Sequence, residues 1–301
     1  MTNKAFKSGF VAIVGMPNVG KSSLLNAIAG QKIAIISDKP QTTRNKILAI
    51  YTTEDEQIIF TDTPGIHKPH NKLGEFMVNE AKRSVDDTDI IVFMVDATRK
   101  IQDMEREIAQ SLHNSGLPCI LVINKIDLVR KEDLLPLIAN YSSLAEFAAV
   151  VPISAKNEDG IELLLNDIRE YLEEGPKFYY DDMVTDQPEK QIAAEIIREK
   201  LLWCLEKEVP HGIAIEIERM QEKKNLTAIN AVIYCEKASH KGIIIGKNGE
   251  MLKRVGSMAR GDIEKMLDKK VYLELWVRVK NDWRNSDFLM KNFGFTNEEN
   301  F

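Results

Sequence analysis

The sequence is poor in the features that mark secreted, metal-binding and membrane-spanning chains. Its three cysteines, Cys119, Cys204 and Cys235, are far apart, and its five histidines form no cluster. This spacing disfavours a disulfide framework or a metal site and favours cysteines that pack as small hydrophobic residues in a reduced compartment. No apolar run reaches the ~18 residues of a membrane span, and the N-terminal stretch does not resemble a signal peptide. We therefore expect a cytoplasmic protein.

A strong overall charge is also absent, since the net charge of the 301 residues is −6. The length suits two domains of roughly 150 residues each, and the hydrophobic content is sufficient for two cores. Residues 237–291 differ from the rest, because they hold 13 Lys and Arg against 7 Asp and Glu, a net charge of +6. A basic segment in an acidic protein predicts a local site for a polyanion.

The most informative stretch is a glycine-bracketed loop, 15–22, which follows the apolar run 10–14 and precedes a helix-competent stretch ending at Gly30. A loop of this kind at a helix N-terminus points several backbone N–H groups one way and can surround the phosphates of a nucleotide. Its lysine contacts the β- and γ-phosphates and its serine hydroxyl ligates Mg²⁺. The predicted nucleotide-binding residues here are Gly15, Met16, Pro17, Asn18, Val19, Gly20, Lys21, Ser22 and Ser23.

The next segments predict a loop followed by a hairpin. Residues 31–45 show no sustained period, so we expect a mobile loop. Strands over 46–51 and 57–61 are joined by an acidic turn, which favours an antiparallel pair. The second strand leads into Asp62, Thr63, Pro64 and Gly65. A carboxylate at this strand end can hold Mg²⁺ through water, and the Gly65 N–H can approach the γ-phosphate.

Further apolar strands, over 90–95, 118–123 and 150–153, alternate with helical stretches. Continuous apolar strands alternating with helices predict an α/β fold, a doubly wound and mostly parallel sheet covered on both faces. Ligands bind such sheets at the carboxyl ends of the strands, where the polar motifs of this chain fall.

The motif at 124–127 predicts selection of guanine. The Asp127 carboxylate can accept hydrogen bonds from the N1–H and the 2-amino group of guanine, which adenine lacks at those places. Asn124 can meet the N7/O6 edge, and the Lys125 stem can lie over the ring. A polar site left unpaired by the wrong base discriminates by about 10⁴ to 10⁵. A last loop, Ser154, Ala155 and Lys156, brings an Ala155 N–H that can bond guanine O6.

Together, the motifs at 15–22, 42–43, 62–65, 124–127 and 154–156 resemble the ordered set of translation-factor-related P-loop GTPases, over about the first 175 residues. The resemblance implies that Thr42 or Thr43 closes on Mg²⁺ when GTP is bound, and we favour Thr43. The implied metal ligands are then Ser22, Thr43 and Asp62.

The sequence departs from the Ras-type pattern at Ile66, where a glutamine orients the attacking water. Arg44 is the one candidate for an internal arginine finger, which contributes about 10³ to 10⁵ in rate, so we expect slow intrinsic hydrolysis. Asn18 resembles the loop asparagine with which related GTPases bind K⁺ in place of the finger. We interpret His67 and His70 as solvated loop residues. The predicted catalytic residues are Lys21, Thr43, Asn18 and Gly65.

A breaker-rich linker, 176–188, precedes a second pattern. An amphipathic helix is predicted over 189–207, followed by a hairpin of strands over 213–217 and 227–235. A short helix then breaks at Gly246-Lys247-Asn248-Gly249 and restarts as a helix to about Leu267, before a strand over 271–279. This order resembles type II KH domains, whose loop glycines clamp about four nucleotides of single-stranded RNA.

The resemblance places bases in an apolar groove lined by residues such as Ile244 and Ile245, with phosphates near nearby lysines. We expect Trp276 in the core, and consider Trp283 and Arg284 exposed candidates for further RNA contact. The predicted RNA-binding residues are Lys241, Ile244, Gly246, Lys247, Asn248, Gly249, Lys253 and Arg254.

The predicted organisation is a GTPase domain (1–175), a linker (176–188), a type II KH domain (189–291) and a flexible tail (292–301). Over nearly its whole length the chain resembles bacterial ribosome-assembly GTPases. That resemblance implies binding to the 3′ end of small-subunit ribosomal RNA, a role in small-subunit assembly, and peripheral membrane association in some members. We also expect a monomer. Two alternatives stay open: an RNA-binding module whose nucleotide is a structural or regulatory ligand, and a small-molecule phosphotransferase, which the 124–127 motif disfavours.

Overall fold

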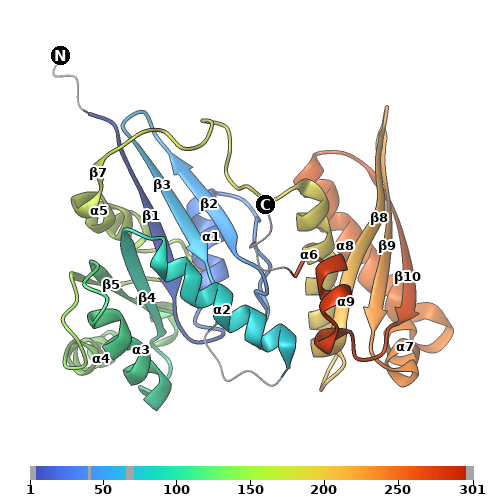
Figure 1. The fold of residues 1–301 in the computed structure, drawn as a ribbon, viewed down its shortest axis with the longest axis horizontal. Coiled ribbons are helices and arrows are strands. Elements are labelled where there is room, and N and C mark those ends of the chain that lie inside the picture. The colour runs from blue at the N-terminus through green and yellow to red at the C-terminus, as the bar shows by residue number, and fades with distance from the viewer. Residues whose placement is uncertain (1–4, 40–41, 66–70, 296–301) are drawn as a thin grey trace. The chain divides into compact units, whose positions relative to one another are not determined.

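A computed structural model describes residues 5–39, 42–65 and 71–295, which form two compact units (Figure 1). The first unit runs to Asp186, and the second consists mainly of the residues that follow. The second unit also takes in described residues of the segments 35–42 and 69–76. No helix in these ranges is long and apolar enough to cross a membrane.

The first unit is built on one sheet with the strand order β2-β3-β1-β4-β5-β6, and β7 pairs with β1. Strand β1 is parallel to β3 and β4, and β5 is parallel to β4 and β6, whereas β2 pairs antiparallel with β3. The hairpin and the mostly parallel sheet are therefore confirmed. The strands are β1 (Lys7–Val14), β2 (Ile47–Thr52), β3 (Glu56–Asp62), β4 (Ile90–Asp96), β5 (Cys119–Asn124), β6 (Ala149–Pro152) and β7 (Glu173–Glu174).

Two hydrophobic cores lie on the two faces of this sheet, because successive strand residues point to opposite sides. Val11 and Ile13 pack with residues of α1 and α5, whereas Ala12 and Val14 pack with residues of α3 and α4. The sheet is thus covered on both faces, as the apolar strands predicted. The helical segments are α1 (Lys21–Ala29), α2 (Lys72–Asp86), α3 (Asp103–His113), η1 (Ile126–Leu128), α4 (Lys131–Ser142) and α5 (Ile161–Tyr171).

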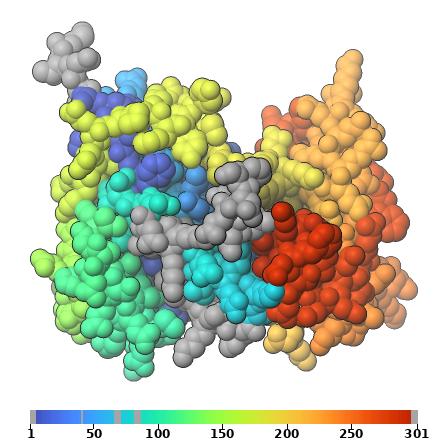
Figure 2. Space-filling view, viewed as in Figure 1, coloured from blue at the N-terminus to red at the C-terminus, as the bar shows by residue number. Residues whose placement is uncertain are grey.

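The second unit is a three-stranded sheet of order β10-β9-β8, with β9 antiparallel to β8 and parallel to β10. The order helix, two strands, two helices and strand confirms the type II arrangement. The tip of the β8–β9 hairpin projects beyond the rest of this unit (Figure 2). The elements are α6 (Glu189–Cys204), η2 (Pro210–Gly212), β8 (Ile213–Lys223), β9 (Leu226–Cys235), α7 (Ala238–Ile245), η3 (Lys247–Gly249), α8 (Glu250–Leu267), β10 (Val271–Val279), η4 (Trp283–Asn285) and α9 (Asp287–Asn292).

Helix α6 ends three residues earlier than the pattern predicts, because Leu205 adopts an extended backbone (φ −107°, ψ 154°).

A buried lysine joins α6 to α8. Lys200 is 2% exposed, and its Nζ lies 2.7 Å from Glu199 and 2.5 Å from Asp262 of α8. Burial lowers the pKa of Lys200, but the two carboxylates raise it by more, so the net pKa is raised and the ammonium stays charged. This ion pair holds α6 against α8, and the apolar face of α6 packs in the core of this unit.

All three cysteines are free thiols. Burial raises the pKa of the Cys119 thiol to about 12, and it also raises the pKa of Cys235. Thiols in this state are poor nucleophiles and poor metal ligands at neutral pH. The structure therefore agrees with a packing role for Cys119 and Cys235.

Candidate functional site

The loop between β1 and α1 forms a tight turn that only glycine can complete. Gly20 has φ +109°, and a Cβ there would lie 2.2 Å from Nδ2 of Asn124. Gly15 is equally constrained, since a Cβ would lie 2.3 Å from the carbonyl oxygen of Met94. The two glycines let the loop lie directly against β4 and the 124–127 motif. The predicted phosphate-binding loop and the predicted base-binding motif are therefore adjacent.

Lys21 is buried inside this loop. It is 6% exposed, and its Nζ donates to the carbonyl oxygens of Gly15 and Met16, at 3.1 Å each. Burial lowers the pKa of Lys21, and the nearby Asp62 carboxylate opposes the shift. A phosphate group at this place would add the negative charge that a buried ammonium favours.

Three side-chain oxygens meet at the ends of α1, the 42–43 segment and β3. The Ser22 hydroxyl donates to Asp62 Oδ2 at 2.7 Å, the Thr43 hydroxyl does so at 3.1 Å, and the two hydroxyls are 2.9 Å apart. Asp62 is fully buried, and its Oδ1 has no hydrogen-bond partner within the described ranges. Burial raises the pKa of Asp62, while Lys21, Ser22 and Thr43 oppose the shift. A buried, underpaired carboxylate beside two hydroxyls fits a hard divalent cation such as Mg²⁺.

The structure distinguishes the two neighbouring threonines. Thr43 is 7% exposed and lies with Ser22 and Asp62. The hydroxyl of Thr42 instead donates to the carbonyl oxygen of Lys39 at 2.7 Å. Thr43 is therefore the threonine that lies beside Ser22 and Asp62, the other two predicted metal ligands.

The remaining residues near the phosphate loop have mixed outcomes. Gly65 lies against Pro17, since a Cβ there would be 2.9 Å from Pro17 Cα. The Thr63 hydroxyl donates to Ile13 O at 3.0 Å and joins β3 to β1, which is a packing role. Arg44, considered as an arginine finger, is only 2% exposed. Ile66, His67 and His70 lie outside the described residues.

The segment at the end of β5 clamps three loops together. Asn124 is 3% exposed; its Nδ2 donates to Val19 O at 2.8 Å and its Oδ1 accepts the Ala155 N–H at 3.0 Å. The Ala155 N–H was expected to bond guanine O6, but the structure directs it at Asn124 instead. Lys125 has φ +67°, and its Nζ donates to Asn18 O at 2.8 Å. An amide nitrogen has two hydrogens, so Asn124 can still donate one to the base.

The carboxylate expected to read guanine is itself oriented. The Ser154 hydroxyl, 1% exposed, donates to Oδ1 of Asp127 at 2.7 Å. Lys156 of the same loop is exposed. The structure therefore gives Ser154 a role through Asp127, which the sequence pattern did not predict.

In the second unit, the 246–249 loop joins α7 to α8 through three residues with positive φ. These are Gly246 (+73°), Asn248 (+51°) and Gly249 (+77°). A Cβ on Gly246 would lie 2.7 Å from Cβ of Met251, so this position excludes any side chain. The loop backbone is thereby held open beside exposed Lys247, a geometry that lets an RNA backbone approach closely.

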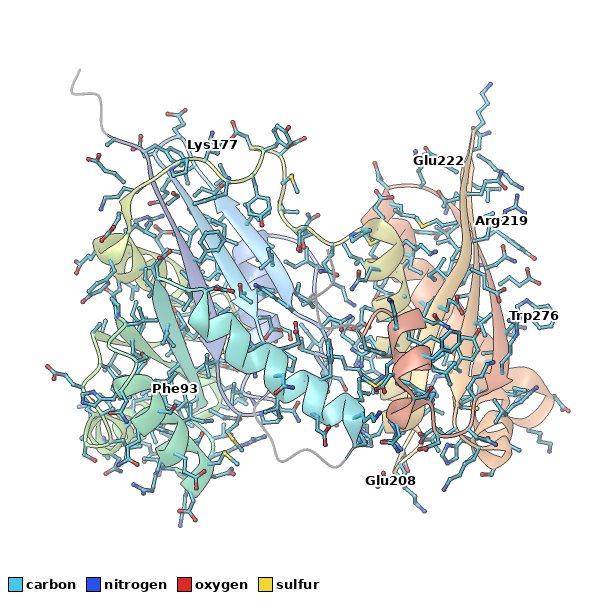
Figure 3. All side chains as sticks on the ribbon, in the orientation of Figure 1. Phe93, Lys177, Glu208, Arg219, Glu222 and Trp276 are labelled. Carbon is cyan, nitrogen blue, oxygen red and sulfur yellow. The ribbon has the colours of Figure 1, made fainter. Side chains whose placement is uncertain are left out.

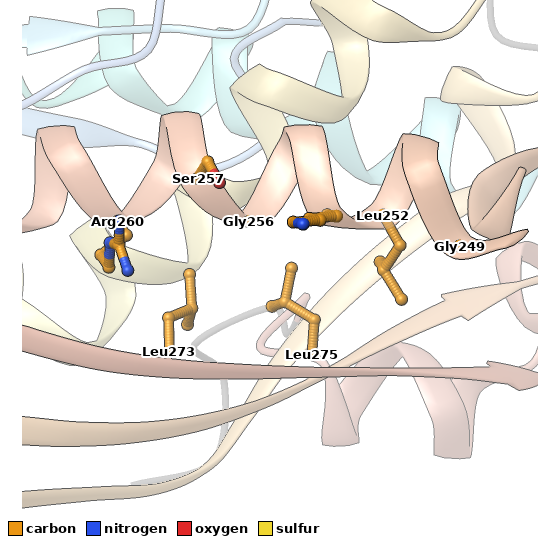
Figure 4. A pocket seen from close by; sticks show the side chains of 8 residues that line it. Gly249, Leu252, Gly256, Ser257, Arg260, Leu273 and Leu275 are labelled. Carbon is orange, nitrogen blue, oxygen red and sulfur yellow. The ribbon is translucent and has the colours of Figure 1, made fainter.

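A groove of about 430 Å³ runs between α8 and β10, next to this loop (Figure 4). Its leucines are Leu252 on α8 and Leu273 and Leu275 on β10, and Gly256 leaves room between them. Its polar side chains are Lys253, Ser257 and Arg260. An apolar floor with cations at the rim suits unstacked bases and their phosphates.

The prediction that Ile244 lines the groove is wrong. Ile244 is 0% exposed and packs in the core of the second unit. Lys241, Lys247 and Arg254 are exposed but do not line the groove, whereas Lys253 and Gly249 do. Leu252, Gly256 and Arg260 line the groove but were not predicted. A pattern in the sequence could have indicated them, because they recur every four residues and so share one face of the predicted helix.

The two tryptophan interpretations are also wrong. Trp276 is 56% exposed, because it lies on the face of β10 opposite to Leu275 and Val277, which pack in the core (Figure 3). Trp283 is fully buried, donates its Nε1–H to Gly212 O at 3.0 Å, and packs against Phe293 and Phe295. The turn begins at Asp282, whose φ of +52° directs the chain back to the core.

Comparisons with known proteins identify two domain families in this chain. Residues 10–125 match the family model of the 50S ribosome-binding GTPases, and residues 208–284 match that of the KH domain. The GTPase Era of Ruminiclostridium cellulolyticum is 53% identical over 98% of this chain and 100% of its own length. The GTPase Era of Clostridioides difficile is 53% identical over 97% of this chain and 100% of its own length.

Two solved structures are similar over 97% of this chain and 100% of their own chains. One is an Aquifex aeolicus Era variant bound to GDP and AlF4⁻, with 42% identity and a TM-score of 0.93. The other is Era in complex with MgGDPNP and nucleotides 1506–1542 of 16S ribosomal RNA, with 41% identity and a TM-score of 0.92.

Proposed function

This chain belongs to the Era family of GTPases, and from that premise we propose that it binds single-stranded RNA at the 3′ end of small-subunit ribosomal RNA. Its role would be in small-subunit assembly. The observation that supports this most directly is the groove of α8 and β10 beside the 246–249 loop. The ribosomal RNA complex of a similar Era protein supports the same choice of RNA.

The experiment for this proposal is binding of a single-stranded RNA copy of the 3′-terminal segment. Gly246→Asp should abolish RNA binding, because a side chain there clashes with Met251 and adds a negative charge beside the phosphates. GTP hydrolysis by the same purified variant should be unchanged, since the nucleotide site is built from other residues. Equal affinity for an unrelated sequence would contradict the choice of RNA.

The nucleotide site supports Mg²⁺ as the metal, held by Ser22 and Thr43, with Asp62 acting directly or through water. The ion supplies charge neutralisation on the phosphates. Lys21 and the loop N–H groups bind the phosphates, and Asp127 selects guanine. Lys21→Ala should therefore abolish GTP turnover, and turnover that persists in this variant would contradict the assignment.

We also propose K⁺ as an activating ion at Asn18. The support is the resemblance of this loop asparagine to those of K⁺-binding relatives, together with its backbone, since φ is +65° and the carbonyl is held by Lys125. A cation here would take the place of the missing arginine finger. Faster hydrolysis in K⁺ than in Na⁺ buffer is expected, and equal rates would refute it.

We further propose a cytoplasmic monomer, and the family resemblance alone supports peripheral membrane association. Cell fractionation tests the location and the membrane association, and light scattering tests the monomeric state. The division of the structure near Asp186 supports a linker between a GTPase domain and a KH domain in the 176–188 region. The domain bounds proposed are 1–175 and 189–291, and limited proteolysis at the linker tests them.

A further inference from the structure

The phosphate loop has a feature that its sequence motif does not explain. Five successive backbone carbonyls, from Gly15 to Val19, each accept a hydrogen bond from a side chain. The donors are Lys21 to Gly15 and Met16, Arg99 to Pro17, Lys125 to Asn18, and Asn124 to Val19. Four of these bonds come from motif residues, and Arg99 alone belongs to none of the motifs.

The carbonyls matter because a phosphate loop must turn its N–H groups toward the nucleotide. The C=O groups of the same peptides then point to the other side, where they need donors. A cation at a carbonyl also polarises its peptide, so the N–H of the following residue becomes a better donor. Arg99 at the Pro17 carbonyl, 3.5 Å away, therefore acts on the peptide that presents the Asn18 N–H.

Arg99 is held in this position by a buried carboxylate at the end of β4. Asp96 is 1% exposed, and its Oδ2 lies 3.3 Å from Nε of Arg99 and 2.6 Å from Nζ of Lys125. Its Oδ1 accepts the backbone N–H of Thr98 at 2.9 Å and the Thr98 hydroxyl at 2.7 Å. One carboxylate thus orients the two cations that hold adjacent carbonyls of the loop.

We propose that Arg99 is a positioning residue for the nucleotide phosphates and that Asp96 is its anchor. The inference rests on the guanine-nucleotide site proposed above. Arg99 acts from behind the loop and does not touch the nucleotide. The Arg99 side chain is 39% exposed, and the buried Asp96 keeps its bonds to Lys125 and Thr98 when Arg99 is removed, so we expect loss of Arg99 to change stability little. The effect should therefore be found in nucleotide binding rather than in folding.

The test is the dissociation rate of fluorescent GDP and GMP from the full chain with Mg²⁺. Arg99→Ala should release GDP about threefold to tenfold faster, as expected for one weakened charge-assisted hydrogen bond. GMP lacks the β-phosphate that the loop surrounds, so its release should change much less. Exposed Lys100 is the matched control, and Lys100→Ala should behave as the unaltered protein.

Unaltered GDP release from Arg99→Ala, or equal acceleration of GMP and GDP, would overturn the proposal. Failure of the unaltered protein to bind GDP would instead refute the nucleotide site itself. Asp96→Asn provides the second test. If Asp96 is the anchor, Arg99→Ala should add almost nothing to GDP release in the Asp96→Asn background. A full additional effect in the double variant would contradict the anchoring role.

Discussion

The Ser154 hydroxyl donates a 2.7 Å hydrogen bond to Oδ1 of Asp127, which fixes the carboxylate that is expected to read guanine. Both residues follow strands of the same sheet, β5 and β6, which are parallel neighbours. The carboxyl ends of parallel neighbours lie together, so two loops 27 residues apart in sequence share one function. We therefore expect guanine selection to depend also on a residue outside the 124–127 motif.

The first prediction concerns this pair. Asp127→Asn should weaken GTP binding and allow xanthosine nucleotides to bind, because the amide places a donor where the carboxylate places an acceptor at the base edge. Ser154→Ala should keep the preference for guanine but lower the affinity for GTP about fivefold, because it removes one orienting hydrogen bond worth ~1 kcal/mol. Competition binding with GTP, ATP and XTP measures both. Unchanged base preference in Asp127→Asn would refute the assignment.

The second prediction uses the adjacent threonines as a matched pair. Thr43→Ala should slow GTP turnover and raise the Mg²⁺ concentration needed, since it removes a hydroxyl from the oxygens around Asp62. Thr42→Ala should change neither quantity much, because its hydroxyl is directed at Lys39 O. A Mg²⁺ titration of steady-state hydrolysis distinguishes them. The reverse order of effects would exclude Thr43 as the ligand.

Sequence reasoning predicted the sheet and the site motifs because each has a local pattern. The apolar strands and the glycine loops are contiguous in sequence, and their chemistry follows from residue types. The partners that come from distant segments had no such pattern. In the sequence, Asp96 and Arg99 only mark the end of a strand and the turn after it. The role that we propose for them depends on the pairing of β4 with β1, which brings them to the phosphate loop.

The predictions for the two tryptophans were wrong for a related reason. Alternation along 271–279 shows that Tyr272 and Trp276 share a face, but it does not show which face the helices cover. The packing of α6 and α8 decides this, and it depends on contacts between segments far apart in sequence. Ile244 likewise reads as a groove residue in a short apolar run, where periodicity alone cannot separate core from surface.

The third prediction concerns the pH dependence of Asp96. Burial raises its pKa, but the hydrogen bonds from Lys125 and Thr98 outweigh burial, so the net pKa is lowered. A lowered carboxyl pKa stabilises the folded state above the unfolded value, and this contribution disappears as the pH falls through the folded value. The stability difference between the unaltered protein and Asp96→Asn should be constant between about pH 5 and 8 and shrink below about pH 4.

Hydrogen exchange at the amides of β4, corrected for the intrinsic pH dependence, measures this difference in the first unit. The Asp96→Asn variant keeps the shape of the side chain, so any change reflects charge and hydrogen bonding. A difference that grows on acidification would show that the carboxylate is destabilising when charged, against the geometry.

The last prediction compares two arginines on the same helix. Arg260 lines the groove of α8 and β10, whereas Arg254 is exposed on α8 and does not line it. Arg260→Ala should therefore weaken RNA binding more than Arg254→Ala, although the two changes alter net charge equally. If Arg260 contacts a phosphate, its loss should also reduce the dependence of log affinity on log salt concentration by about 0.7.

Fluorescence anisotropy of a labelled single-stranded RNA between low and moderate salt measures both quantities. Equal losses from the two variants would mean that the RNA senses only the net charge of the second unit. That result would contradict the groove as the RNA site, because a defined site distinguishes an arginine that lines it from one that does not. A larger loss for Arg260→Ala with an unchanged salt slope would instead indicate that Arg260 contacts a base edge, which retains the groove and changes only the partner of this side chain.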